Sequence, residues 1–201
     1  RVLGLPEYLA GIEVVQPGFI NLTLKEDFLS RELERVLKEK EKFGSSLDGM
    51  GKTVIVDYSG PNIAKPFGIG HLRSTNIGQA IYNLYKALGW KTIGDNHLGD
   101  WGTQFGKLIY QIKNKKLTLK DLTIERLEKL YVQFHQQTVK HPELEDEARF
   151  WFKKLEDNDP EARRIWQKCV DVSMVEFERI YDLLGVKIDN VYGESFYNKK
   201  A

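Results

Sequence analysis

The chain has 201 residues with a formal net charge of +1, 41% hydrophobic and 29% charged residues, a balance that argues against a disordered chain and a mainly electrostatic nucleic-acid binder. The single cysteine, Cys169, excludes an internal disulfide framework and argues against a cysteine-based zinc site. No stretch approaches the ~18 apolar residues of a membrane span, and the first residues lack the order of a signal peptide, so we expect a cytoplasmic protein without a membrane partner.

Residues 1–51 are interpreted as a small N-terminal attachment. The sequence IEVVQPGFINLTL at 12–24 predicts two short strands, or a strand and a turn, around Pro17-Gly18. The sequence KEDFLSRELERVLKEKEKFG at 25–44 has apolar residues at helical spacing and predicts a helix that ends at Gly44. A flexible connector, GSSLDGMGK, follows, and we expect a domain boundary near Gly51.

Residues 52–201 begin with a strand, a loop, a helix and a second strand. TVIVDYS at 53–59 is a short apolar run, which is typical of a buried strand in a parallel sheet. HLRSTNIGQAIYNLYKALG at 71–89 predicts a helix, and WKTIGDN at 90–96 predicts the next strand. This order predicts one right-handed crossover unit of an α/β fold with a Rossmann-like parallel sheet.

The pattern from Trp101 to about Leu184 is almost entirely helical and predicts a long helical insertion at about 107–184. After it, VKIDNVYGE at 186–194 predicts a strand that returns to the sheet. Cys169 is expected to be a packing residue of this insertion. Four aromatic residues there form either helical core or a stacking platform for RNA: Phe150, Trp151, Phe152 and Trp166.

The loop between the first strand and its helix, DYSGPNIAKPFGIGHLRST at 57–75, concentrates groups that suit a nucleotide phosphate. Ligands of open α/β sheets bind at the carboxyl ends of strands, and the following helix offers unpaired N–H groups to an anion. Gly68 and Gly70 would let phosphate oxygens approach the backbone, and Lys65 and His71 would add a cation and a donor. The alternative is an ordinary strand-helix loop with glycines for turning.

Two common phosphate motifs do not fit this region. A Walker-type loop that ends at Gly51-Lys52-Thr53 would need a glycine where Ser46 stands, and it would precede the strand. A dinucleotide fingerprint from Gly68 would need a glycine where Arg73 stands. The loop therefore belongs to another type of nucleotide site.

The segments VDYSGPNIAKPFGIGHLRST at 56–75 and NHLGDWGTQFGKLI at 96–109 resemble the class I aminoacyl-tRNA synthetases, and among them the arginyl-tRNA synthetases. The resemblance extends over the whole chain, from EVVQPGFINLTL, which is similar to the end of the family's N-terminal tRNA-contacting domain, to VYGESFYNKK. It implies that 52–201 is part of a catalytic domain, with the insertion at about 107–184 facing RNA.

The resemblance implies roles for individual residues. Arginine would be bound by Asp57, Ser59 and Asn62, and the arginine side of the pocket would include His97, Asp100 and Gln104. ATP would be bound by Lys65, Gly68, Gly70 and His71, with Lys65 and His71 also stabilising charge during the reaction. For Asp100 and Gln104 the alternative is helix capping and hydrogen bonding in a first turn. Trp101 is expected to be a packing anchor.

The reaction implied by the resemblance is attack of the arginine carboxylate on the α-phosphorus of ATP, followed by transfer of the arginyl group to tRNA(Arg), which is needed for the first step as well. Magnesium is implied only as the companion of ATP, and no spacing in the chain predicts a transition-metal site.

Several features depart from the family pattern. Gly68 replaces the first signature histidine, and Gly60 stands where the family usually has serine. The chain also lacks the lysine-rich loop that grips pyrophosphate, so we expect a fragment that is inactive alone. A catalytically inactive arginine- or RNA-binding module is therefore the alternative hypothesis. The unpaired edge of a partial sheet favours self-association, although the sequence does not define an oligomeric state.

Overall fold

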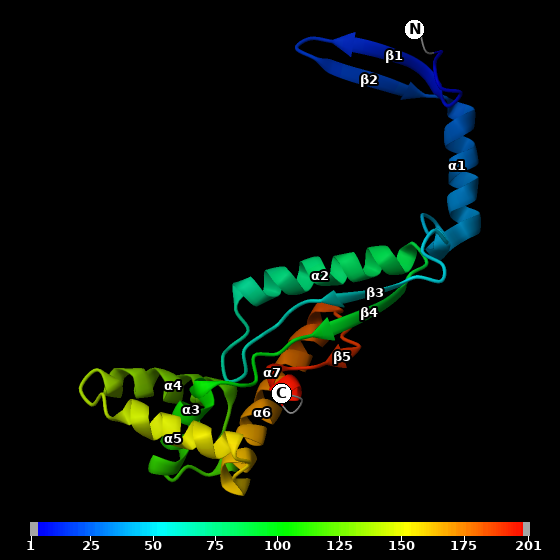
Figure 1. Cartoon of the computed structure of the whole chain (residues 1–201). Coiled ribbons are helices and arrows are strands. Elements are labelled where there is room, and N and C mark those ends of the chain that lie inside the picture. Colours follow the sequence, from blue (N-terminus) through cyan, green and yellow to red (C-terminus); the bar gives the residue numbers. More distant parts are fainter. Residues whose placement is uncertain (1–3, 199–201) are drawn as a thin grey trace. The chain divides into compact units, whose positions relative to one another are not determined.

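The computed structural model describes residues 4–198, and the chain divides into two compact units between Ser46 and Leu47 (Figure 1). This division lies near the boundary expected at Gly51, and the assignment of domains stays a prediction. In the described part no helix is both long and apolar enough to cross a membrane.

The first unit contains a hairpin and a helix. Strands β1 (Leu9–Val15) and β2 (Phe19–Leu24) pair antiparallel, with Pro17-Gly18 in the turn. Helix α1 (Glu26–Glu39) follows and continues into the short 3-10 helix η1 (Lys40–Lys42). The pair of strands is therefore the correct one of the two alternatives, and the predicted helix is present. The predicted helix end at Gly44 is wrong, because the backbone of Lys40, at φ 49°, interrupts the α-helix after Glu39.

The second unit is built on a parallel sheet with the strand order β3-β4-β5. Strands β3 (Thr53–Asp57) and β4 (Lys91–Asn96) pair along their whole length, and the short strand β5 (Asn190–Val191) pairs with the end of β4. The α/β fold with a parallel sheet is therefore confirmed. Helix α2 (Ile69–Ala87) connects β3 to β4, and it begins two residues before the predicted helix because Gly68 is its N-cap.

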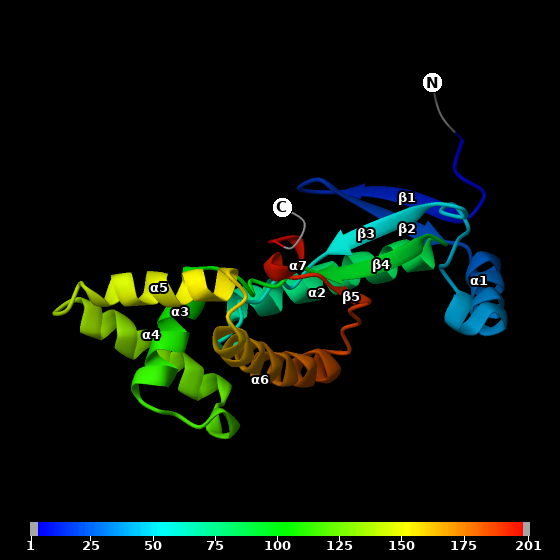
Figure 2. The same cartoon turned by 60° about the horizontal axis from the view of Figure 1, so that its bottom comes forward.

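Helix α2 and the segment that follows the helical insertion, around Lys187, lie on the same face of the sheet (Figure 2). Tyr58, directly after β3, packs against Gly78 of α2 and donates a hydrogen bond to the carbonyl of Lys187. A Cβ atom on Gly78 would overlap the Tyr58 side chain, so only glycine permits this approach. The expected strand is present, but its expected burial is wrong, because no residue of β3 is buried and Ile55 and Asp57 are exposed.

The helical insertion runs from α3 (Thr103–Asn114) through α4 (Ile124–Thr138) and α5 (Leu144–Glu156) to the long helix α6 (Pro160–Leu184). A short 3-10 helix, η2 (Leu119–Asp121), lies between α3 and α4. Helix α3 starts before the predicted insertion boundary at about 107, because Gly102, at φ 120°, turns the chain into a helix at Thr103.

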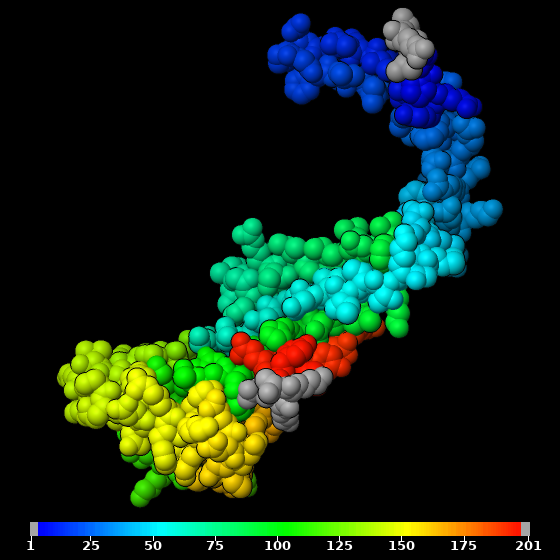
Figure 3. Space-filling view, viewed as in Figure 1, coloured from blue at the N-terminus to red at the C-terminus, as the bar shows by residue number. Residues whose placement is uncertain are grey.

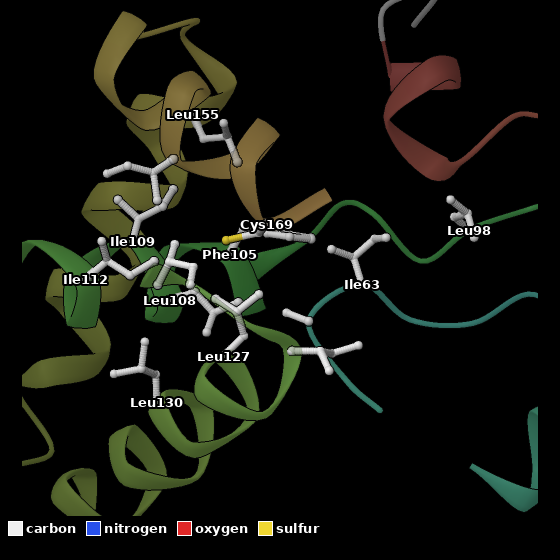
Figure 4. Packing of buried hydrophobic residues seen from close by; sticks show 14 of the residues in the cluster. Ile63, Leu98, Phe105, Leu108, Ile109, Ile112, Leu127, Leu130, Leu155 and Cys169 are labelled. Atoms are coloured by element: carbon white, nitrogen blue, oxygen red, sulfur yellow. The ribbon is translucent and has the colours of Figure 1, made fainter. Parts of the chain in front are cut away.

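The main hydrophobic core lies inside this insertion and extends to the strand-following loops (Figure 4). Phe105 and Leu127 are fully buried there, and Ile63 and Leu98 of the two loops belong to the same cluster. The loops are therefore anchored on the helices. Three of the four aromatic residues considered for RNA stacking, Trp151, Phe152 and Trp166, pack against this core, whereas Phe150 is exposed.

Cys169 is fully buried in this core, as expected for a packing residue, and burial raises the pKa of its thiol to about 12. Because the thiolate is the reactive form, we expect iodoacetamide at pH 8 to label the native chain about a hundredfold more slowly than the chain in urea. Mass spectrometry of the two time courses measures this ratio. Equal labelling rates would show that the core around Cys169 is open.

The chain after the insertion differs from the prediction. A strand was expected over 186–194, but β5 has only two residues, and helix α7 (Glu194–Asn198) begins at the end of that range. The cause is a long-range contact, because the carboxylate of Asp100 accepts hydrogen bonds from the N–H and the hydroxyl of Ser195. These bonds turn the backbone out of the sheet. Figure 3 shows the segment around α7 lying against the main body of the second unit.

Candidate active site

Two loops lie side by side at the carboxyl edge of the sheet, one after β3 and one after β4. Asn62 and Gly99 form an isolated parallel bridge. The Ile63 N–H donates to the Gly99 carbonyl at 3.1 Å, and the Gly99 N–H donates to the Pro61 carbonyl at 3.2 Å. A Cβ atom on Gly99 would overlap the Asn62 side chain. This edge is where α/β sheets bind ligands.

A cavity of about 340 Å³ opens beside the paired loops, and its lining joins four regions of the sequence: Asn62, Trp101, Gly102, Thr103, Gln104, Lys107, Tyr131 and Glu194. Gln104 donates from Nε2 to the Gly99 carbonyl at 3.3 Å, which leaves its Oε1 and its second N–H for a ligand. The structure therefore brings together two predicted residues, Asn62 and Gln104.

Glu194 supplies the carboxylate of this cavity, and the sequence analysis did not name it. The Glu194 N–H donates to the carbonyl of Leu98 at 3.0 Å, which ties it to the loop after β4. Its carboxylate forms no ion pair with another described residue. The available signal was its position at the end of a predicted strand, next to Gly193.

Asp100 holds the segment that carries Glu194. Its two oxygens lie 2.8 Å from the Ser195 nitrogen and 2.6 Å from the Ser195 hydroxyl, and its side chain is buried. A Cβ atom on Gly193 would come within 2.5 Å of this carboxyl group, so a glycine is needed there. Asp100 thus makes first-turn hydrogen bonds to α7, and in this arrangement it does not line the cavity.

The N-terminus of α2 forms a second, open part of the candidate site. A Cβ atom on Gly68 or Gly70 would meet nothing within 4 Å, and no side chain caps the first helical N–H groups. The Nδ1 atom of His71 accepts the Gly68 N–H at 3.2 Å. A neutral His71 therefore carries its proton on Nε2, which is left to donate to an anion.

Lys65 does not line the cavity, but its ammonium lies 5.4 Å from the centre of the ring of Tyr131, which does. Lys107, also at the cavity, pairs with Glu145 at 3.0 Å. Partial burial and then the Lys107 ammonium hold the pKa of His135 below its usual value, and Lys65 contributes in the same direction. Among the residues that line the cavity, Lys107 is the cation, and its charge is paired with Glu145.

Three other predicted residues lie outside the cavity lining. Asp57 is exposed at the end of β3, in register with Asp95 of β4. His97 makes a hydrogen bond between Nδ1 and the Tyr192 carbonyl at 2.9 Å, which fixes Nδ1 as the donor. The hydroxyl of Ser59 is buried and bonds to Thr75 and Tyr181. The predicted ligand roles of these residues stay predictions.

Residues 32–201 match the family model described as "tRNA synthetases class I (R), catalytic domain". The chain is 50% identical to the arginine–tRNA ligase of Clostridioides difficile over 186 residues, which are 91% of this chain, and 49% identical to that of Exiguobacterium sibiricum over 185 residues, which are 90% of this chain. It spans only 33% of the length of each of these curated relatives.

Among solved structures, the arginyl-tRNA synthetase of Plasmodium falciparum is similar, with a TM-score of 0.64 and 29% identity over 97% of this chain and 34% of that chain. The arginyl-tRNA synthetase of Thermus thermophilus, at 22% identity and a TM-score of 0.63, over 96% of this chain and 31% of that chain, shares the fold. Because the family match covers most of its length, this chain belongs to the class I (R) tRNA synthetases, within their catalytic domain.

Proposed function

We propose that this chain is the arginine- and ATP-binding part of an arginine–tRNA ligase, the activity that its relatives are named for. The observation that carries this proposal is the cavity beside the paired loops, where Asn62, Gln104 and Glu194 converge. A guanidinium group has only donors, and a carboxylate with amide oxygens matches it in charge and hydrogen bonding. Glu194 is therefore proposed as the anionic partner of arginine, with the exposed Asp57 as a second carboxylate at the same edge.

ATP is proposed to bind at the N-terminus of α2, with its magnesium arriving as part of the substrate. The N–H groups around Gly68 and Gly70 would face the phosphates, and the Nε2 proton of His71 would be donated to them. Lys65 would add positive charge. No protein nucleophile is required, since the arginine carboxylate itself attacks the α-phosphorus and pyrophosphate leaves. Catalysis is then positioning plus stabilisation of phosphate charge.

The other assignments are also proposals. Residues 1–51 would be the end of an N-terminal tRNA-contacting domain with its connecting helix. The insertion would face the RNA, and the protein would act in the cytoplasm on tRNA(Arg). The replacement of the first signature histidine by Gly68 favours one second candidate, a catalytically inactive arginine- or RNA-binding module.

The test is arginine-dependent exchange of pyrophosphate into ATP, measured with tRNA(Arg) present on the full-length synthetase that carries this segment. We expect exchange with L-arginine and no exchange with L-lysine, because an ammonium cannot match the forked geometry of a guanidinium. Binding of arginine without any exchange would support the inactive module instead. Exchange that is equally fast with lysine would contradict the proposed specificity.

A further inference from the structure

A chain of buried polar groups joins α6 to the loop after β3. The Tyr181 hydroxyl lies 2.7 Å from Ser59 Oγ and accepts the Asn96 amide N–H at 3.0 Å. Thr75 Oγ1 lies 2.9 Å from Ser59 Oγ and 2.6 Å from the carbonyl oxygen of His71. Thr75 and Asn96 are fully buried, and Ser59 and Tyr181 are nearly so, so water cannot replace these partners.

The hydroxyls at the two ends of this hydrogen-bond chain have defined partners. The Thr75 hydroxyl is placed to donate both to Ser59 Oγ and to the His71 carbonyl, which share its one hydrogen. Asn96 donates from its amide to the Tyr181 oxygen. Between Ser59 and Tyr181 either hydroxyl can donate, so the two side chains remain bonded in both cases.

These hydrogen-bonded groups hold the loop after β3 at the point where the loop backbone is strained. Ser59 has φ 77° and Gly60 has φ 59°, both in the left-handed region that a residue with a side chain rarely adopts. The other atom of the Asn96 amide, Oδ1, accepts the Gly60 N–H at 3.0 Å. Asn96 therefore ties the turn directly at Gly60 and, through Tyr181, at Ser59.

We propose that Tyr181 is a positioning residue of the arginine and ATP site. Its hydroxyl fixes the turn at Ser59-Gly60, from which the chain runs to Asn62 in the cavity, and it couples that turn to the first turn of α2 at His71. Tyr181 itself does not line the cavity. The Ser59 hydroxyl is buried and bonds to Thr75 and Tyr181, so we assign it to this hydrogen-bond chain. The inference rests on the proposed function.

The test is Tyr181→Phe in the full-length synthetase, because phenylalanine keeps the ring that packs edge-on against Phe67 and removes only the hydroxyl. We expect the KM for arginine to rise about tenfold, as for the loss of one buried hydrogen bond, with kcat changed less than about threefold. Thr75→Ser, which keeps a hydroxyl, is expected to behave like the wild type, and Thr75→Val to behave like Tyr181→Phe.

Tyr110→Phe is the matched control. The Tyr110 ring packs against Phe134 in the insertion, and its hydroxyl makes no hydrogen bond to another described residue. A merely structural role for Tyr181 would lower thermal stability without separating KM from kcat. An unchanged KM for arginine in Tyr181→Phe would overturn the proposal, as would the same increase in Tyr110→Phe.

A second readout does not depend on activity. In this chain, amide hydrogen exchange at Gly60 is expected to be about tenfold faster in Tyr181→Phe, while exchange at Leu155 in α5 stays unchanged. Unchanged exchange at Gly60 would show that the hydroxyl does not hold the turn. The two proposals can fail separately. If the wild-type enzyme shows no arginine-dependent pyrophosphate exchange, the proposed function is refuted. Faster amide hydrogen exchange at Gly60 in Tyr181→Phe would still support the positioning of the turn by Tyr181.

Discussion

Replacing Glu194 by glutamine is expected to raise the KM for arginine about a hundredfold in the full-length synthetase, a loss of about 3 kcal/mol. Glutamine keeps the size of the side chain but removes the charge and turns an N–H group toward a guanidinium that has only donors. The KM for ATP is expected to change less than about threefold, since the groups proposed to bind the ATP phosphates lie at the N-terminus of α2. Pyrophosphate exchange at varied arginine and ATP concentrations measures both constants.

Glu178→Gln is the matched control for this substitution. Glu178 is exposed on α6, away from the residues that line the cavity, and its replacement removes the same charge from the protein. The control is expected to leave both KM values within about twofold of the wild type. If Glu194→Gln raised the KM for ATP as much as that for arginine, the assignment of Glu194 to arginine binding would be wrong.

The parts of the fold that sequence predicted well are those with strong local patterns. The apolar run at β3, the helical spacing of α2 and the long helices of the insertion all carry their periodicity in neighbouring residues. The segment after the insertion carries no such periodicity. Its path depends on contacts with residues far away in sequence, above all Asp100, whose carboxylate accepts two hydrogen bonds from Ser195 in the first turn of α7.

The candidate site divides in the same way. Asn62 and Gln104 lie in the two motifs that the sequence already displays, and both line the cavity. Glu194 comes from a distant segment, and it reaches the cavity because β5 pairs with β4 and Leu98 accepts its N–H. The burial and bonding of the Ser59 hydroxyl were likewise unpredictable, since its partner Tyr181 lies in the insertion. Side chains whose partners are distant in sequence need the tertiary structure.

Phe177→Ala is expected to lower the free energy of unfolding by about 3–5 kcal/mol, the usual loss for a fully buried phenylalanine. Phe177 is 0% exposed on α6, and its ring lies 6.0 Å from that of Phe67 in an edge-on contact. Phe67 in turn lies 5.5 Å from the His71 ring. Alanine would leave a cavity between the insertion and the loop that carries the proposed phosphate site. Urea unfolding followed by circular dichroism measures the midpoint of the transition and the dependence of the free energy of unfolding on urea concentration.

Val175→Ala is the control, because Val175 is on the same helix but 69% exposed, and its truncation is expected to cost less than about 0.5 kcal/mol. Phe177→Leu keeps most of the buried volume and is expected to lose less stability than Phe177→Ala, which matters if the alanine variant does not fold. Equal unfolding midpoints for Phe177→Ala and Val175→Ala would mean that α6 does not support the loop through Phe67. The coupling of the insertion to His71 would then depend on the hydroxyl chain from Tyr181 alone.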